Sequence, residues 1–140
     1  MVLRLGCGYL QDDEFIVAFE NCHLEPGSFH HADHVRLAWL YVSRFGAQKA
    51  ETCLLAGIRK MATNAGVPAK FLYTATVAWV RLVAAARKNA PPDQPFAAWI
   101  AAHPELLARD LLERYYSKTL LESPEARDGW ISPDLAPIES

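Results

Sequence analysis

The segment Lys70–Lys88 constrains the fold most, because it is apolar almost all the way round when it is drawn as a helix. A helix at the surface of a globular protein keeps one polar face, so a helix without such a face is expected to be buried. The β-branched and aromatic residues of 71–80 would also suit a strand, but the length of the segment and the Ala84–Ala86 run favour a helix. Other segments must then cover this helix, which predicts an all-α bundle with a buried central helix.

Helical periodicity recurs in further segments, which are separated by breaks rich in Gly, Pro and Asn. The expected helices cover residues 12–22, 28–45, 48–64, 95–102 and 105–117, with a short last turn over 124–128. Ser28 is expected to cap the second of these helices, and Ser123 the last turn. From about Gly129 we expect an irregular tail that Trp130 holds against the body. Because 140 residues suit one domain, the sequence predicts a single compact bundle of about five to six helices over 1–140.

The charge balance and the apolar runs exclude two classes of partner. Fourteen Lys and Arg against sixteen Asp and Glu give a formal net charge of −2, whereas a nucleic-acid-binding domain is usually strongly basic. No apolar run reaches the roughly 18–20 residues that a membrane helix needs. The opening Met1–Gly6 is too short for the apolar core of a signal peptide. We therefore expect a cytoplasmic protein that binds neither nucleic acid nor a membrane.

The three cysteines, Cys7, Cys22 and Cys53, are far apart and form no C-x-x-C pair. Neither a zinc knuckle nor a dithiol redox site is indicated by this spacing. Cys22 and Cys53 lie on apolar helix faces, so they are interpreted as small core residues rather than as nucleophiles. Reduced thiols of a cytosolic protein are the expected state.

Three of the five histidines, His30, His31 and His34, fall within five residues near the start of the expected helix 28–45. On a helical wheel at about 100° per residue, all three lie on the side of Leu37 and Tyr41, which is the apolar side. The pattern therefore predicts that these imidazoles point towards the core.

Three interpretations of the histidines remain open. The spacings i, i+3 and i, i+4 let His31 and His34 bind one divalent metal ion such as zinc or iron, although no third ligand can be assigned. An imidazole with a pKa near 6.5 can also act as an acid or base without any metal. The third interpretation is structural, with the rings bonded to carbonyl groups in a polar part of the core.

The central helix contributes the other candidate site residues. Tyr73, Thr74 and Arg81 would suit a pocket that orients an oxygen-rich small molecule. Arg81 lies seven residues after Thr74 on the same helix face. Pairing of its guanidinium with an acidic residue of a neighbouring helix is favoured over binding of an anionic ligand, because a buried arginine usually has a protein partner.

Four motifs of the chain together resemble those of one family. F-H-H-A-D-H-V-R-L-A-W, followed about 40 residues later by K-F-L-Y-T-A-T-V-A-W and near the end by R-Y-Y-S and P-D-L-A-P, is similar to a group of small bacterial all-helical proteins. That group is mostly uncharacterised. The resemblance spans residues 29–137 and implies the helical fold already expected.

The resemblance also bears on the site. Members of that group open the buried helix with K-Y-H-E-T-x-T and so carry a histidine and a glutamate where this chain has Leu72 and Tyr73. The resemblance implies that those two groups meet the histidine pair in a metal or acid/base site. Thr74, Thr76 and Trp79 match in this chain, but the histidine and glutamate do not. This departure favours metal-free chemistry here.

The first functional hypothesis is a small all-α enzyme with a pocket between the histidine helix and the central helix. His31 and His34 would be its catalytic groups and the ligands of any metal, with His30, Tyr73, Thr74 and Arg81 lining the substrate site. The reaction would be proton transfer on a small organic molecule, as in a lyase, isomerase or cyclase, or the metal-assisted chemistry of a small metalloenzyme.

The second hypothesis is a non-catalytic module that binds a small ligand or another protein, with structural histidines. A homodimer is compatible with the aromatic content but is not indicated by any motif. Convergence of the imidazoles on a cavity would favour the enzyme, whereas bonds to carbonyl groups or exposed carboxylates would favour the module.

Overall fold

The computed structural model describes residues 10–25, 27 and 29–138, and this part of the chain is helical without any β-strand. The α-helices are α1 (Asp12–Glu20), α2 (His31–Phe45), α3 (Ala47–Asn64), α4 (Tyr73–Arg87), α5 (Phe96–Ala101), α6 (Lys118–Leu121) and α7 (Pro124–Asp128). Three 3-10 segments lie between them: η3 (Pro68–Lys70), η4 (Pro104–Leu107) and η5 (Arg109–Arg114). The all-α class is confirmed, with somewhat more helices than expected because several are short.

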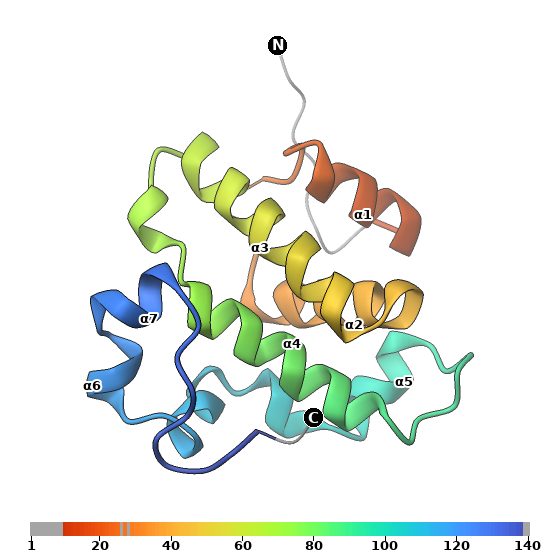
Figure 1. Cartoon of the computed structure of the whole chain (residues 1–140). Coiled ribbons are helices and arrows are strands. Elements are labelled where there is room, and N and C mark those ends of the chain that lie inside the picture. The colour runs from red at the N-terminus through yellow and green to blue at the C-terminus, as the bar shows by residue number, and fades with distance from the viewer. Residues whose placement is uncertain (1–9, 26, 28, 139–140) are drawn as a thin grey trace.

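Helix α4 crosses the middle of the molecule, as Figure 1 shows, and packs against α2, α3 and α7. Eight of its fifteen residues are buried, among them Thr74, Thr76 and Trp79. Covering by other helices on several sides explains why its sequence has almost no polar face. The prediction of a buried central helix is confirmed.

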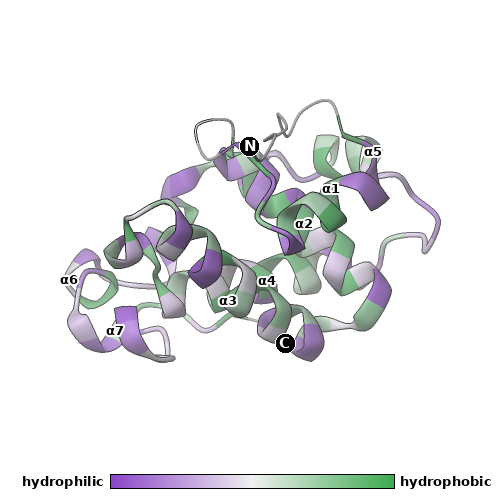
Figure 2. Ribbon diagram, turned by 90° about the horizontal axis from the view of Figure 1, so that it is seen from above, coloured by the Kyte–Doolittle hydropathy of each residue, from purple (hydrophilic) through white to green (hydrophobic). Residues whose placement is uncertain are grey.

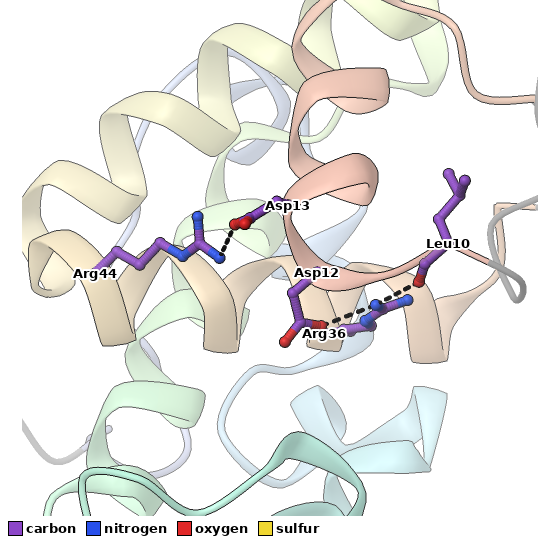
Figure 3. Close-up of polar contacts among 5 residues, drawn as sticks. All are labelled: Leu10, Asp12, Asp13, Arg36 and Arg44. Carbon is purple, nitrogen blue, oxygen red and sulfur yellow. Dashed lines mark hydrogen bonds and ion pairs between the residues drawn. The ribbon is translucent and has the colours of Figure 1, made fainter.

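Two ion pairs fasten α1 to α2 (Figure 3). The Arg36 guanidinium donates to Asp12 Oδ1 at 2.9 Å and to the carbonyl oxygen of Leu10 at 2.8 Å. About two helical turns further along α2, Arg44 donates to Asp13 Oδ1 at 2.6 Å. The polar side of α2 is thus partly occupied by the start of α1, while its apolar side faces the core.

The helices carry alternating bands of hydrophobic and hydrophilic residues, which Figure 2 shows along their ribbons. The largest fully buried side chains join all parts of the fold, since they include Phe15, Tyr41, Trp99 and Tyr116. None of the helices in the described ranges has the length and apolar character that crossing a bilayer requires. Cys22 and Cys53 are free thiols, and Cys7 lies outside the described residues.

The segment 105–117 is not the single amphipathic α-helix that its sequence predicts. It forms the 3-10 segments η4 and η5, which are separated by Ala108 in an extended conformation (φ −84°, ψ 116°). This break lets Leu106 on one side and Leu111 and Leu112 on the other all enter the core. The carbonyl of Leu106 then accepts a hydrogen bond from His31 instead of a bond within a continuous helix.

The C-terminal part follows the prediction closely. The Ser123 hydroxyl accepts from the amide of Ala126 at 3.2 Å and so caps α7, whereas the expected cap Ser28 of α2 lies outside the described residues. After Gly129 the chain is irregular, and the Trp130 ring packs edge-on against Tyr116. The short helix α6, capped by Ser117, was not expected.

Candidate functional site

Helix α2 begins at His31, and the residue before it, His30, is its N-cap. The backbone amide of His30 donates to Asp33 Oδ2 at 2.9 Å, which satisfies one of the groups that a helix start leaves without a partner. The His30 side chain is 70% exposed and lies 3.7 Å from the same carboxylate. The helical wheel placed His30 on the core side because the expected helix 28–45 began before His31, where α2 actually starts.

The His31 ring is held by two contacts. Its Nε2 lies 2.9 Å from the carbonyl oxygen of Leu106, and its ring packs edge-on against Trp79 with centroids 4.4 Å apart. A carbonyl oxygen only accepts, so the Nε2 of His31 must be the donor. In the neutral ring the proton therefore sits on Nε2, and Nδ1 keeps a free lone pair.

The surroundings of His31 keep its ring neutral. Burial is the main cause that lowers its pKa below the ordinary value of 6.5, and the positive charge of Arg109 lowers the pKa further. The hydrogen bond to Leu106 acts in the opposite direction but does not outweigh them. At neutral pH His31 is thus a base rather than a cation.

His31 lines a hollow of about 440 Å³, which we call the His31 pocket. Its walls come from α2, α4, η5 and α6, together with the residue before α4 and the residue after α6. The lining residues are His31, Leu72, Ala75, Trp79, Arg109, Leu112, Glu113, Lys118, Leu121 and Glu122. Trp79 and Leu112 are buried and form the floor with the half-buried His31. The pocket therefore combines an apolar floor with one imidazole.

Four charged side chains stand at the rim of the His31 pocket. Arg109 and Lys118 are cationic, Glu113 and Glu122 are anionic, and all four are exposed. Within the described part of the chain, none of them is in an ion pair. The two positive and two negative formal charges of the rim cancel. Each of these four side chains can contact a ligand, because none of them is engaged in an ion pair in the described structure.

His34 lies deeper than His31. Its Nε2 is buried and has no hydrogen-bond partner among the described residues. Burial, and to a lesser extent the neighbouring His31, lower the pKa of His34 to about 4. Its ring packs towards Phe29 at 6.3 Å and does not line the His31 pocket.

The other three candidate residues lie outside the His31 pocket as well. The hydroxyl of Thr74 bonds to the C-terminal tail, and the ring of Tyr73 packs edge-on against Phe71. The Arg81 guanidinium stacks 4.0 Å above the Trp130 ring and lies 3.4 Å from Glu51. Arg81 thus has an acidic partner from another helix, which is the arrangement favoured from sequence.

Arg81 lines a different hollow of about 390 Å³, whose opposite wall is the tail from Ser132 to Ile138. Thr74 fastens the start of that tail, since its Oγ1 donates to the Gly129 carbonyl and accepts from the Ile131 amide. Of the predicted site residues, His31 and Arg81 thus line two different hollows, and the others line neither of the two.

A metal site does not fit the donor groups present. Nowhere in residues 10–25, 27 and 29–138 do three His, Cys, Asp or Glu side chains come close enough to hold one ion. One ring nitrogen of His31 is committed to Leu106, and the Nε2 of His34 is enclosed away from the pocket.

Several lining residues of the His31 pocket are not predicted from the sequence. Ala75 and Trp79 are four residues apart on α4, and Leu72 is the N-cap of that helix, so this set follows a helical spacing that could have been found. Arg109 and Lys118 could not be found in this way, because the break at Ala108 changes the direction of the chain before them.

The chain was compared with protein-family models, curated proteins and solved structures. No family model matches it, and neither a curated protein nor a solved structure resembles it significantly. A function for this chain must therefore be inferred from its own geometry.

Proposed function

We propose that the chain is a small enzyme in which His31 transfers a proton to or from a small organic molecule bound in the His31 pocket. The observation that supports this proposal is the neutral imidazole at the pocket floor, with Nε2–H held by the Leu106 carbonyl and Nδ1 without a partner in the described structure. A general base needs both an oriented ring and an accessible lone pair.

The proposed step is abstraction of a proton next to a carbonyl group. The C–H bond of the substrate breaks, the proton moves to Nδ1 of His31, and the electron pair left on carbon is delocalised into the carbonyl. The nearby charge of Arg109 disfavours the imidazolium, so His31 readily returns the proton. Return to another atom gives an isomerase, and expulsion of a leaving group from the carbanion gives a lyase.

Hydrogen exchange tests this proposal directly. Phenylpyruvate, phenylacetone and cyclohexanone are incubated with the protein in D₂O, and loss of the proton next to the carbonyl is followed by ¹H NMR. We expect acceleration over the buffer rate for at least one of them, loss of that acceleration in His31→Asn, and its retention in His23→Asn, an exposed control. Acceleration that persists in His31→Asn would overturn the role of His31.

A second candidate is a binding module without catalysis. It is favoured by the position of His34, because the Nε2 of this second imidazole is buried and the ring does not line the pocket with His31. Absence of exchange with all three carbonyl compounds, together with tight binding of a small molecule, would favour this candidate.

The setting proposed for either function is the reducing cytoplasm, with a small molecule as partner. The free thiols of Cys22 and Cys53 support a reducing compartment. The net charge of −2 gives no support for nucleic acid as a partner.

A further inference from the structure

We propose that the ligand of the His31 pocket is a small monocarboxylate with an apolar body, whose carboxylate binds Arg109. This inference rests on the proposed function for the choice of pocket, but it concerns what the pocket holds rather than the reaction. Three properties of the lining support it, namely the position of Arg109, the apolar floor and the two rim glutamates.

Arg109 places a positive charge beside the base. Its charge acts on His31, whereas neither Glu113 nor Glu122 is among the groups that influence that ring. The guanidinium is exposed and has no carboxylate within ion-pair distance in the described structure. An anionic group of a ligand is therefore favoured at the His31 end of the pocket, where a planar guanidinium can hold a carboxylate with two hydrogen bonds.

The floor of the pocket suits an apolar body. Trp79 and Leu112 are buried beneath it, and Leu121 and Ala75 are half-buried at its sides. Ligand pockets are typically about 300–1,000 Å³ and mostly apolar with a few polar groups that fix orientation. A volume of about 440 Å³ accommodates a benzene-sized group together with a short acidic side chain.

The rim glutamates limit the charge of the ligand. Glu113 and Glu122 offset Arg109 and Lys118, so the rim has no surplus positive charge for a second carboxylate. Glu122 also borders the adjoining hollow of about 290 Å³, where it lies beside Leu72 and Leu121. A dicarboxylate would bring its second charge towards these glutamates, which costs binding free energy through like-charge repulsion.

Three matched probes test the inference by isothermal titration calorimetry. Phenylacetate is the monocarboxylate, phenylacetamide is its neutral isostere, and phenylmalonate carries a second carboxylate on the same carbon. We expect phenylacetate to bind at least about tenfold more tightly than either of the others. Phenylacetamide lacks the charge-assisted hydrogen bond to Arg109, and phenylmalonate brings a second charge towards the rim glutamates. Equal binding of phenylacetate and phenylacetamide would overturn the inference.

Variants identify the carboxylate partner. Arg109→Gln should weaken phenylacetate binding about tenfold or more and leave phenylacetamide unchanged, and Arg109→Lys should recover part of the loss. Arg114→Gln is the matched control, because Arg114 is on the same segment η5 but lines another hollow. An equal loss in Arg114→Gln would show a general charge effect and contradict the proposed contact.

The two proposals can fail separately. Phenylacetate binding that depends on Arg109, without hydrogen exchange in any carbonyl compound, would reject proton transfer and keep the ligand class. Exchange of phenylacetone that depends on His31, with no binding of phenylacetate, would keep proton transfer and reject the ligand class.

Discussion

The hydroxyl of Thr74 links the central helix to the backbone of Gly129: its Oγ1 donates to the Gly129 carbonyl oxygen at 2.6 Å. The same oxygen accepts from the amide of Ile131 at 3.0 Å. One buried side chain thus satisfies two backbone groups on either side of Trp130, and it fixes the point where the irregular tail leaves α7.

Thr74→Val should destabilise the protein by about 1–3 kcal/mol, because it leaves the part-buried Ile131 amide and Gly129 carbonyl without their partner. Urea unfolding measures this loss. Thr76→Val is the matched control, since Thr76 is equally buried on α4 but its hydroxyl bonds only to the carbonyl of Leu72. That carbonyl keeps the backbone bond from the Thr76 amide, so the control should lose clearly less stability. Equal losses would contradict the linking role of Thr74.

The fold could be predicted wherever side-chain periodicity determines the structure. The ends of α3 fell within one residue of the expected 48–64, and its terminator Gly66 has the positive φ of 77° that favours glycine. The segment 105–117 could not be predicted, because its pattern of leucines suits an α-helix equally well. Only the positions of its neighbours require the extended residue at Ala108.

Gly57→Ala should destabilise the protein, although alanine is the better helix former by about 1 kcal/mol. A Cβ atom at Gly57 would overlap the Cζ and Cε2 atoms of Phe19, whose ring is buried and has little room to move. Overpacking of this kind costs about 1–3 kcal/mol, so we expect a net loss of about 1 kcal/mol in urea unfolding. A gain in stability would contradict the close packing of α1 on α3.

A second variant checks the cause of that loss. In a Phe19→Leu background the overlap is relieved, so Gly57→Ala should be neutral or stabilising there. The double-mutant cycle then gives a coupling free energy between the two positions. If the stability changes of Gly57→Ala and Phe19→Leu were simply additive, the loss in Gly57→Ala would not arise from overlap with the Phe19 ring.

Acid should destabilise the protein through His34. Its pKa is about 4 in the folded state, as against about 6.5 in the unfolded chain, so the unfolded state binds more protons between these values. The contribution of the neutral His34 ring to the free energy of unfolding is therefore fully present above about pH 6.5, and it is lost as the pH falls towards 4. Between pH 7 and 5 the loss from this group should be about 2 kcal/mol, by the linkage of pKa to stability.

The contribution of His34 to the pH dependence of stability is obtained by comparing wild type with a His34 variant. The lowered pKa of His31 adds to the same acid sensitivity, so the pH dependence of wild type alone does not identify the group. The stability of His34→Gln should depend less on pH than that of wild type, whereas His23→Gln, with an exposed ring, should follow wild type. Parallel curves for wild type and His34→Gln in urea unfolding at pH 7, 6 and 5 would reject the assignment.

The site could be predicted only in part, because its geometry depends on the residue at which α2 begins. His31 was predicted, and it lines the pocket because it is the first residue of α2 and its ring reaches Leu106 and Trp79. The sequence does not show where a helix begins to within one residue, so His30 was placed on the same face although it caps the helix from outside. Arg109 comes from a segment 78 positions away, and no periodicity relates it to His31.

The tautomer of His31 should be visible by NMR. Long-range ¹H–¹⁵N spectra should show a protonated Nε2 and a bare Nδ1 at neutral pH, because Nε2 donates to the Leu106 carbonyl. The pKa of His31 should lie below 6.5, and Arg109→Gln should raise it by removing the positive charge nearby. A protonated Nδ1 would contradict the assignment of Nδ1 as the base.

Metal analysis decides between the metal-free and the metal-dependent form of the histidine chemistry. Because His31 and His34 are joined by no third ligand in the described structure, added zinc or iron should bind the wild type no more tightly than it binds His31→Ala and His34→Ala. Equilibrium dialysis followed by elemental analysis measures this comparison. One equivalent of metal in the wild type, lost in both variants, would establish a metal site, and His31 would then act as a ligand rather than as a free base.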